Sequence, residues 1–496
     1  MLEGRITQSE LESYLWGAAV ILRGLIDAGD YKGYIFPIVF LKRVSDVWDE
    51  EHVTALAAYD DEDLADLPEN HRFTIPSGCH WEDVRSTATN VGARLRSAMI
   101  QIESANPASL EGVFGDAEWT NKDLLPDATL IALVEHFSTR TLSIANLPED
   151  ELGNGYEYLI KRFADDSGHT AQEFYTNRTL VHLMAEMLKP KPGESVYDPT
   201  CGTGGMLISC AAEVKNRGQE HRALHLYGQE RNFTTASIAK MNLFLHGIED
   251  GQIAQDDTLV NPRFLDDAGR LRRFDLVLAN PPYSISNWDR VAFTADRFGR
   301  NVWGVPPQGR ADYAFFQHIA CSMNEKTGRA AILFPHGVLF RQEEAELREN
   351  LVKSGLLETV IGLGPGLFYN SPMEAVVVVL RSKRPPERRN SVLFINAVNQ
   401  VARERAQSFL YPEHRAAILG AYEAFEGKPG FAAVASTDDI ASNAYSLAIP
   451  LYVAAPAGTT TAQPIESVVS QWRAAAAAAD TAVVTLLGTF DTERNQ

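Results

Sequence analysis

Positive charge is scarce in this chain. Its 496 residues include 45 lysines and arginines against 65 aspartates and glutamates, which gives a formal net charge of -20 and a pI near 5.1. Most of such a surface repels the phosphates of nucleic acids. If the chain acts on nucleic acid, a local basic patch or a basic partner must therefore supply the phosphate contacts.

Cysteine is also rare, and long apolar runs are missing. The four cysteines, Cys79, Cys201, Cys210 and Cys321, show neither disulfide nor metal-ligand spacing, so no metal site is predicted. No apolar run has the length of a membrane span, and the polar N-terminus lacks the apolar core of a secretory signal. These absences favour a protein of the reducing cytoplasm.

The first part of the chain is predicted to be helical. Apolar residues recur at helical spacing around Leu11, Leu15 and Leu22, and again from Phe36 to Val44. We therefore predict a helical N-terminal domain over residues 1–145 that serves packing or docking. The strongly acidic stretch 46–69 is expected to be a solvated face or a loop.

Residues 150–400 show a different sequence pattern and are predicted to form the catalytic domain. Short β-rich runs alternate with helical patterns, which predicts an α/β fold with a mostly parallel sheet and helices on both faces. Ligands of such sheets bind outside the carboxyl ends of the strands. The expected strands are residues 195–197, 224–227, 274–279, 330–334, 359–361, 375–380 and 392–396.

The sequence after residue 400 carries weaker signals. Residues 401–463 are expected to be an irregular region that ends in a linker rich in Ala, Pro, Gly and Thr. An amphipathic C-terminal helix is predicted over residues 464–490. Its apolar stripe either folds back on its own domain or docks on a partner.

The tetrapeptide Asn280-Pro281-Pro282-Tyr283 directly follows an expected buried strand. The Asn280 side-chain oxygen and the Pro281 carbonyl can accept hydrogen bonds from an exocyclic amine. The two prolines stiffen the backbone, and Tyr283 offers a stacking face. The motif therefore suits a flat base that carries an amine, although an Asn-Pro turn is also a common way to open a loop.

A glycine-rich turn joins the first expected strand to a helix. Glycines there allow a tight turn and a close backbone approach to a ligand at the helix N-terminus. The turn lacks both the Lys-Ser/Thr ending of an ATP phosphate loop and the spacing of a dinucleotide fingerprint, so by itself it is weak evidence. Its candidate binding residues are Asp198, Thr200, Gly202, Thr203, Gly204 and Gly205.

Two acidic residues follow the next short strands. Glu230 ends the run 224–229 and is placed to accept hydrogen bonds from ribose hydroxyls, as in dinucleotide sites. Asp257 follows a short β-like stretch and could accept a bond from an adenine amine. The alternative for Asp257 is a simple Asx turn.

The segment Glu173-Phe174-Tyr175-Thr176-Asn177-Arg178 precedes the glycine turn. Its rings, hydroxyl, amide and guanidinium suit the carboxylate of an amino acid. The alternative is the start of a helix that Thr176 or Asn177 caps. In chain order, the motifs imply a ligand that carries an amino acid, a ribose and an adenine, which is S-adenosylmethionine.

Motifs in this order resemble those of the class I adenine-N6 DNA methyltransferases. The chain looks specifically like the modification (methyltransferase) subunit of Type I restriction-modification systems, over most of residues 10–400. Asn177, where a proline is common, and Cys201 in the glycine turn depart from the family pattern. Further matches are residues 36–43, 155–159, 309–315, 334–341 and 367–371.

The resemblance implies a fold and a chemistry. The fold is a Rossmann-like S-adenosylmethionine-dependent methyltransferase sheet, preceded by a helical N-terminal domain and followed by a helical tail. Asn280 and Pro281 would accept the two protons of adenine N6, and Tyr283 would stack on the flipped-out base. The methionine portion would lie on Asp198, Thr203, Gly204 and Gly205, the ribose on Glu230 and the adenine on Asp257.

The resemblance also implies partners. They are a separate DNA specificity subunit, a second copy of the chain, double-stranded DNA and, as a further addition, a motor-nuclease restriction subunit. The acidic balance agrees with a separate reader of the DNA sequence, because the most basic run, residues 381–389, is short and is either a solvated loop or a phosphate contact. Two alternatives stay open: a stand-alone methyltransferase on DNA, RNA or a protein amide, and a non-catalytic cofactor-binding component of a defence complex.

Overall fold

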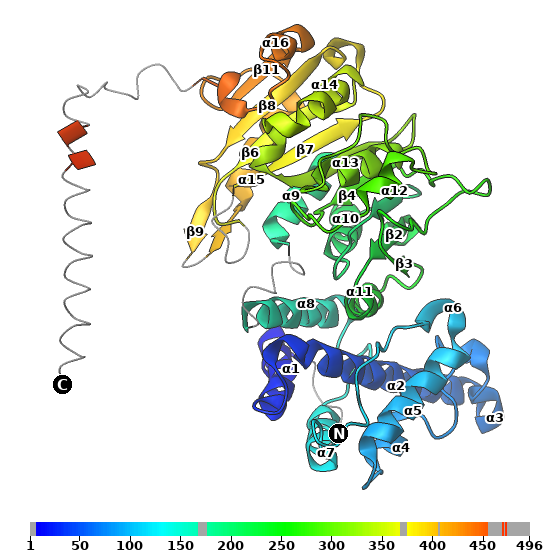
Figure 1. The fold of residues 1–496 in the computed structure, drawn as a ribbon. Helices are drawn as coiled ribbons and strands as arrows, with labels where there is room; N and C mark the ends of the chain where they lie inside the picture. The colour runs from blue at the N-terminus through cyan, green and yellow to red at the C-terminus, as the bar shows by residue number, and fades with distance from the viewer. Residues whose placement is uncertain are drawn as a thin grey trace, which may run out of the picture.

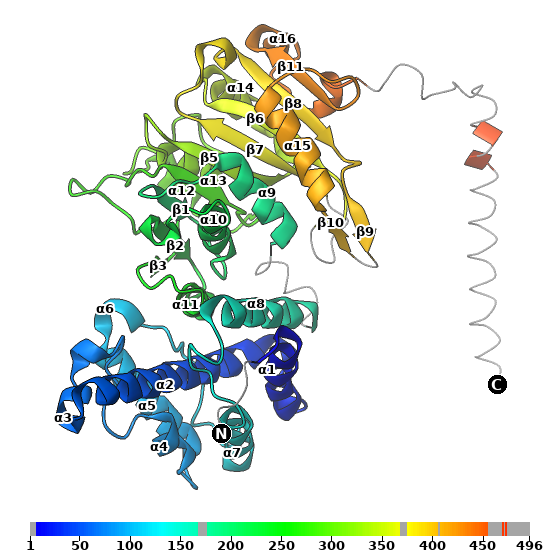
Figure 2. The same cartoon turned by 180° about the vertical axis from the view of Figure 1, so that it is seen from behind.

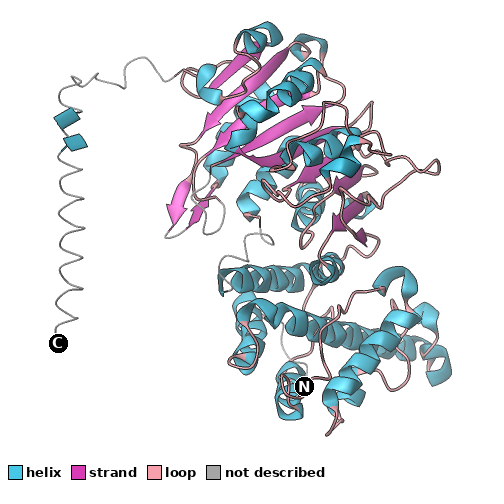
Figure 3. Cartoon of the chain, viewed as in Figure 1, coloured by secondary structure: helices cyan, strands magenta, loops and turns pink. Residues whose placement is uncertain are grey.

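The computed structural model describes residues 6–166, 176–367, 374–404 and 407–454, with two helical fragments at 469–470 and 472–473. A helical N-terminal part lies below an α/β part in Figure 1, and Figure 2 shows the same arrangement from behind. In Figure 3 the strands gather in the upper part. No helix of the described residues is long and apolar enough to cross a bilayer.

The predicted N-terminal helices are confirmed. The apolar residues that predicted them, among them Leu11, Leu15, Phe36 and Phe40, are fully buried in one core. The helices are α1 (Gln8–Leu22), α2 (Tyr31–Tyr59), α3 (Glu62–Ala65), α4 (Trp81–Arg85), α5 (Val91–Ala105), α6 (Pro107–Leu110), α7 (Asp127–Ser138) and α8 (Glu149–Asp166).

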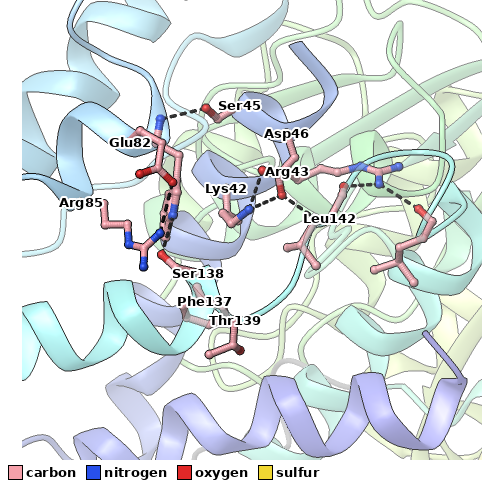
Figure 4. A network of polar contacts seen from close by, with 12 residues as sticks. Lys42, Arg43, Ser45, Asp46, Glu82, Arg85, Phe137, Ser138, Thr139 and Leu142 are labelled. Carbon is pink, nitrogen blue, oxygen red and sulfur yellow. Dashed lines mark hydrogen bonds and ion pairs between the residues drawn. The ribbon is translucent and has the colours of Figure 1, made fainter. Parts of the chain in front are cut away.

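The acidic stretch 46–69 is more ordered than the sequence suggested. Helix α2, which is 29 residues long, continues into this stretch as far as Tyr59, and its C-cap Asp60 adopts the left-handed conformation. Asp46 is not solvated: it pairs with Lys42 one turn earlier, and the two side chains are 8% and 6% exposed. Asp46 also accepts a hydrogen bond from the Leu142 backbone N–H at 2.6 Å, while Arg43 donates to the carbonyls of Leu142 and Leu147 (Figure 4). These contacts tie α2 to the segment that follows α7.

Helix α8 packs in the core of the N-terminal helices, and α11 (Phe233–Leu245) joins that core to the sheet. Leu152, Tyr156 and Leu159 of α8 lie in the helical core. Helix α11 contributes Ala236, Ala239 and Leu243 to the core under the sheet and Ile238, Met241 and Leu245 to the helical core. The Phe244 ring packs against Phe40 and Phe73, with ring centroids 5.1 and 5.0 Å apart. One helix therefore belongs to both parts.

The α/β part contains a nine-stranded sheet in the order β11-β8-β6-β7-β5-β4-β1-β2-β3. The strands from β3 to β5 in this order are parallel, β7 is antiparallel to both of its neighbours, β8 is parallel to β6, and β11 is antiparallel at the edge. All the expected strands are present, so the α/β prediction is confirmed. The bounds are β1 (Ser195–Asp198), β2 (His225–Glu230), β3 (Gln252–Gln255), β4 (Leu276–Ala279), β5 (Arg329–Pro335), β6 (Leu357–Leu363), β7 (Ala375–Arg381), β8 (Ser391–Ala397) and β11 (Ala432–Ser436).

Helices cover both faces of the sheet (Figures 1 and 2). One apolar core lies under α9 (Arg178–Leu188), α10 (Gly205–Asn216), α11 and α15 (Pro412–Ala424). A second core lies under α13 (Asp312–Cys321), α14 (Ala345–Lys353) and α16 (Thr437–Ser442). Helix α12 (Arg290–Thr294) lies in the long connection between β4 and α13.

The region after residue 400 is not irregular, which corrects the expectation. Strands β9 (Ala402–Glu404) and β10 (Gln407–Phe409) pair with each other, α15 packs on the sheet, and β11 extends its edge. The alanine-rich β11 carries few β-branched residues, so its sequence gave no strand signal, and its pairing is made by the backbone. The predicted helix 464–490 lies outside the described residues except for its two short helical fragments, in which Trp472 is 69% exposed.

Candidate active site

The predicted motifs meet at the carboxyl ends of three neighbouring strands. Asp198 ends β1, Glu230 ends β2, and Asn280 directly follows β4. Strand β1 lies between β2 and β4 and is parallel to both. Residues that are far apart in sequence therefore come together at the edge where α/β sheets bind ligands.

The glycine turn has a conformation that needs glycine. Gly202 and Gly204 have φ angles of 53° and 82°, and Gly204 is the N-cap of α10. This is the left-handed region, which residues with a Cβ rarely adopt. At Gly205, a Cβ would collide with the Arg178 guanidinium. The turn thus brings backbone groups and the N-terminus of α10 close to one side of the site.

A small cavity of about 40 Å³ lies over this turn. It is smaller than the roughly 300–1,000 Å³ of typical small-molecule sites. The wall brings seven of the fourteen predicted cofactor residues together with Asn280, whereas Asn177, Gly204, Glu230 and Asp257 are not part of it. It consists of Thr176, Arg178, Val181, Asp198, Thr200, Cys201, Gly202, Thr203, Gly205, Met206 and Asn280.

Two acidic side chains, Asp198 and Glu230, lie at this place. Asp198 is 2% exposed, and burial, with a contribution from Glu230, raises its pKa to about 8. The Thr200 backbone N–H donates to Asp198 at 3.0 Å, and the Gly202 N–H donates to Glu230 at 3.1 Å. A ligand that carries positive charge favours the carboxylate form of Asp198, which burial disfavours. S-Adenosylmethionine carries sulfonium and ammonium groups, so it fits a site with these two carboxyl groups.

Arg178 is held by a network that the sequence did not predict. Its guanidinium pairs with Glu157 of α8, and burial lowers the pKa of Arg178 to about 10. Glu157 also accepts a hydrogen bond from Asn242 of α11 at 2.6 Å, and Asn242 donates to the Thr203 carbonyl at 2.8 Å. The only sequence feature that pointed to Glu157 was its place in the family-like stretch 155–159. No sequence feature pointed to Asn242.

The Asn280 side chain is bonded at both of its polar atoms. Its Nδ2 donates to Thr176 Oγ1 at 3.0 Å, and its Oδ1 accepts from the Tyr283 hydroxyl at 2.7 Å. Burial raises the pKa of Tyr283 well above its usual value, so the hydroxyl keeps its proton. Pro281 is buried and Pro282 is exposed. Thr176, which is predicted to serve the cofactor, lies in the cavity wall and also bonds the amide of Asn280.

Asn177 and Asp257 follow the alternatives that the sequence left open. Asn177 caps α9 by accepting the Thr179 N–H at 3.0 Å, and its amide donates to the Ser408 carbonyl at 2.9 Å. Asp257 Oδ1 accepts two backbone N–H groups, from Leu259 at 2.9 Å and Val260 at 3.2 Å, which makes the Asx turn. Short polar side chains prefer such local backbone bonds, which explains both positions.

The remaining members of the predicted clamp, Glu173, Phe174 and Tyr175, lie outside the described residues.

Comparison with known proteins assigns the family. The model of the N-6 DNA Methylase family matches residues 148–460, and that of the HsdM N-terminal domain matches residues 11–137. The chain is 29% identical to the Type I restriction enzyme MjaIX methylase subunit of Methanocaldococcus jannaschii, over 90% of this chain and 84% of that protein. It is 30% identical to the MjaVIII methylase subunit of the same organism, over 85% of this chain and 72% of that protein.

A solved structure agrees with these relatives. The crystal structure of a type I restriction-modification system methyltransferase subunit from Streptococcus thermophilus superposes with a TM-score of 0.79 at 29% identity, over 90% of this chain and 100% of that one. The predicted resemblance is therefore confirmed over both parts of the molecule. The chain belongs to the N-6 DNA methylase family and, within it, to the methylase subunits of Type I restriction enzymes.

Proposed function

We propose that this adenine-specific DNA methyltransferase performs its chemistry at the cavity between the glycine turn and Asn280. The observation that carries the proposal is that Asn280 shares one cavity wall with Asp198, Arg178 and the glycine turn. A base acceptor and a cofactor cradle in one wall are what direct transfer between two bound molecules requires. The target adenine must leave the duplex to reach this wall.

The catalytic residues act by binding the amine of the base. Asn280 Oδ1 and the Pro281 carbonyl accept hydrogen bonds from the two N6–H groups, which localises the nitrogen lone pair and aims it at the cavity. S-Adenosylmethionine, when bound, supplies an electrophilic methyl group. The Tyr283 hydroxyl occupies one lone pair of Oδ1, and the second lone pair remains for the base. Thr176 fixes the orientation of the amide from its other side.

The cofactor is held by the strand ends and the glycine turn. Asp198, Thr203, Gly204 and Gly205 bind its methionine portion, with Arg178 facing the carboxylate. Glu230 accepts from the ribose hydroxyls. Asp257 Oδ1 is used by the Asx turn and Oδ2 lies 3.5 Å from Nε of the exposed Arg231, so the adenine of the cofactor would take the place of that arginine at Oδ2.

A separate specificity subunit reads the DNA sequence in this proposal. The chain carries a net charge of -20, and three arginines of its most basic run are bonded within the fold. Arg381 donates to Glu358 at 2.9 Å, Arg384 donates to the Leu357 carbonyl at 2.7 Å, and Arg388 donates to the Glu423 carbonyl at 3.0 Å. Guanidiniums that are committed to the fold give little help with phosphates. We expect two copies of this chain to join one specificity subunit on double-stranded DNA, and a motor-nuclease subunit to complete the restriction complex.

A paired experiment tests the chemistry and the cofactor site separately. In complex with the specificity subunit, Asn280→Ala should reduce methyl transfer to duplex DNA by about 100-fold, as for loss of a preorganised hydrogen-bonding group. Its affinity for S-adenosylmethionine, measured by calorimetry, should stay within about threefold, because Asn280 binds the base and not the cofactor in this proposal. Glu230→Ala should weaken that affinity by about tenfold, as expected for a charge-assisted hydrogen bond. Transfer at the normal rate by Asn280→Ala would show that the chemistry is assigned to the wrong residue.

A further inference from the structure

The residue after the catalytic tetrapeptide has an unfavourable backbone conformation. Ser284 has a φ angle of 51°, in the left-handed region that side-chain-bearing residues rarely adopt. It follows Tyr283 directly, so its conformation sets the direction in which the chain leaves the tetrapeptide. A conformation of this kind persists only where surrounding contacts hold it.

Asp312 supplies those contacts. The Ser284 backbone N–H donates to Asp312 Oδ1 at 2.7 Å, and the Ser284 hydroxyl donates to Asp312 Oδ2 at 3.3 Å. Asp312 is the first residue of α13 and is 1% exposed. A buried carboxylate with two bonds to one residue fixes both its backbone and its side chain.

Arg341 closes the network from a third segment. It follows β5 and donates to Asp312 Oδ2 at 2.7 Å and to the Ser284 hydroxyl at 3.3 Å. Its side chain is 17% exposed. Both residues fall in stretches that resemble the family, 309–315 and 334–341, and neither belongs to the wall of the cofactor cavity.

We propose that Asp312 and Arg341 are positioning residues of methyl transfer, which hold Ser284 in its left-handed turn and thereby keep Tyr283 against Asn280 and Asn280 in the cavity wall. The inference rests on the proposed role of Asn280. Asp312 and Arg341 touch neither the base nor the cofactor. They act on catalysis through the backbone at Ser284.

The matched control is a second buried ion pair in the same sheet. Arg381 pairs with Glu358, whose side chain is 2% exposed. Arg381 pairs in register with Arg329, the first residue of β5. It therefore lies at the end of the strands opposite to the carboxyl ends that carry the site. Removing the charge of Glu358 disturbs the fold in a comparable way without reaching Ser284.

The test is whether glycine at position 284 restores activity after the Asp312 carboxylate has been removed. In the complex with the specificity subunit, Asp312→Ala should lower kcat by about 100-fold, the order of loss that a misplacement of about 1 Å causes. The affinity for S-adenosylmethionine should change by less than about threefold. Adding Ser284→Gly should restore kcat by about tenfold, because glycine adopts the left-handed conformation without steric cost. Glu358→Gln should leave kcat unchanged.

Two results would overturn the inference: a folded double variant that recovers no activity, or a loss of cofactor affinity in Asp312→Ala as large as the loss of kcat. If Asp312→Ala does not fold, Asp312→Asn takes its place, with a loss of about tenfold that Ser284→Gly again reduces. Asn280→Ala, measured in parallel, separates the two proposals. Transfer by Asn280→Ala refutes the proposed function, whereas its inactivity together with a failed glycine rescue refutes only the role of Asp312 and Arg341.

Discussion

Asp198 should make the affinity for S-adenosylmethionine depend on pH. Burial first, and then the neighbouring Glu230, bring the pKa of Asp198 to about 8, so the free protein holds a proton there at neutral pH. A cationic ligand beside this group favours the carboxylate, so binding below pH 8 must release the proton. Affinity should therefore rise with pH and level off above the pKa.

The size of the effect follows from the pKa. At pH 6, two units below it, about 1% of the carboxyl groups are ionised, so the apparent affinity should be about 100-fold weaker than its plateau. At pH 7 the deficit should be about tenfold. The free protein should show a related effect, because the pKa of Asp198 is raised from 3.8. The native state keeps a proton that the unfolded chain has lost, so its contribution to stability is full below pH 3.8 and disappears as pH rises through about 8.

Calorimetric titration between pH 6 and pH 9 of the wild type and Asp198→Asn measures this dependence. Asparagine has the same size and does not titrate, so its profile should lack the dependence due to residue 198. The ligand's own α-amino group titrates near pH 8 in both proteins, and the ratio of the two profiles removes it. Thermal unfolding of the free proteins should show a melting temperature that falls more for the wild type than for the variant between pH 6 and pH 8. Equal profiles for the two proteins would refute the reasoning.

Two further changes test the base site and the N-terminal core. Tyr283→Phe removes the hydroxyl bonded to Asn280 but keeps the ring, so binding of a flipped base should survive, whereas Tyr283→Ala should weaken it by about 1–3 kcal/mol. The fluorescence of 2-aminopurine at the target position measures this, and equal losses in the two variants would exclude stacking. Asp46→Ala leaves the buried ammonium of Lys42 without its carboxylate and should lower the free energy of unfolding by about 3–5 kcal/mol. Denaturant unfolding measures this, and adding Lys42→Met should recover most of the loss; a change below about 1 kcal/mol would mean that water reaches the lysine.

The gathering of the main motifs could be predicted because local signals combine with sheet topology. Apolar runs placed the strands, and parallel neighbours put their carboxyl ends on one edge. That was enough to bring Asp198, Glu230 and Asn280 together before any contact was known. The glycine pattern in the same way anticipated the left-handed turn at the start of α10.

The contacts that orient these groups could not be predicted, because each joins residues that are remote in the chain and lack a local pattern. Thr176 bonds Asn280 across 104 positions, and Glu157 meets Asn242 across 85. At Asp257 the sequence left two roles open, and the structure shows the backbone partners of the Asx turn, while the adenine role stays a prediction. The strand β11 was missed because backbone pairing at a sheet edge requires no distinctive side chains.

The double membership of α11 has a mechanical consequence. The helix starts three residues after Glu230, and its opposite sides are locked into two separate interiors. Because both sides of α11 are packed, a displacement of the N-terminal helices should move α11 with them. We therefore expect it to shift Glu230, where the ribose binds. Binding of a partner to the N-terminal helices would then change the affinity for the cofactor, and binding of the cofactor would change the affinity for that partner by the same factor.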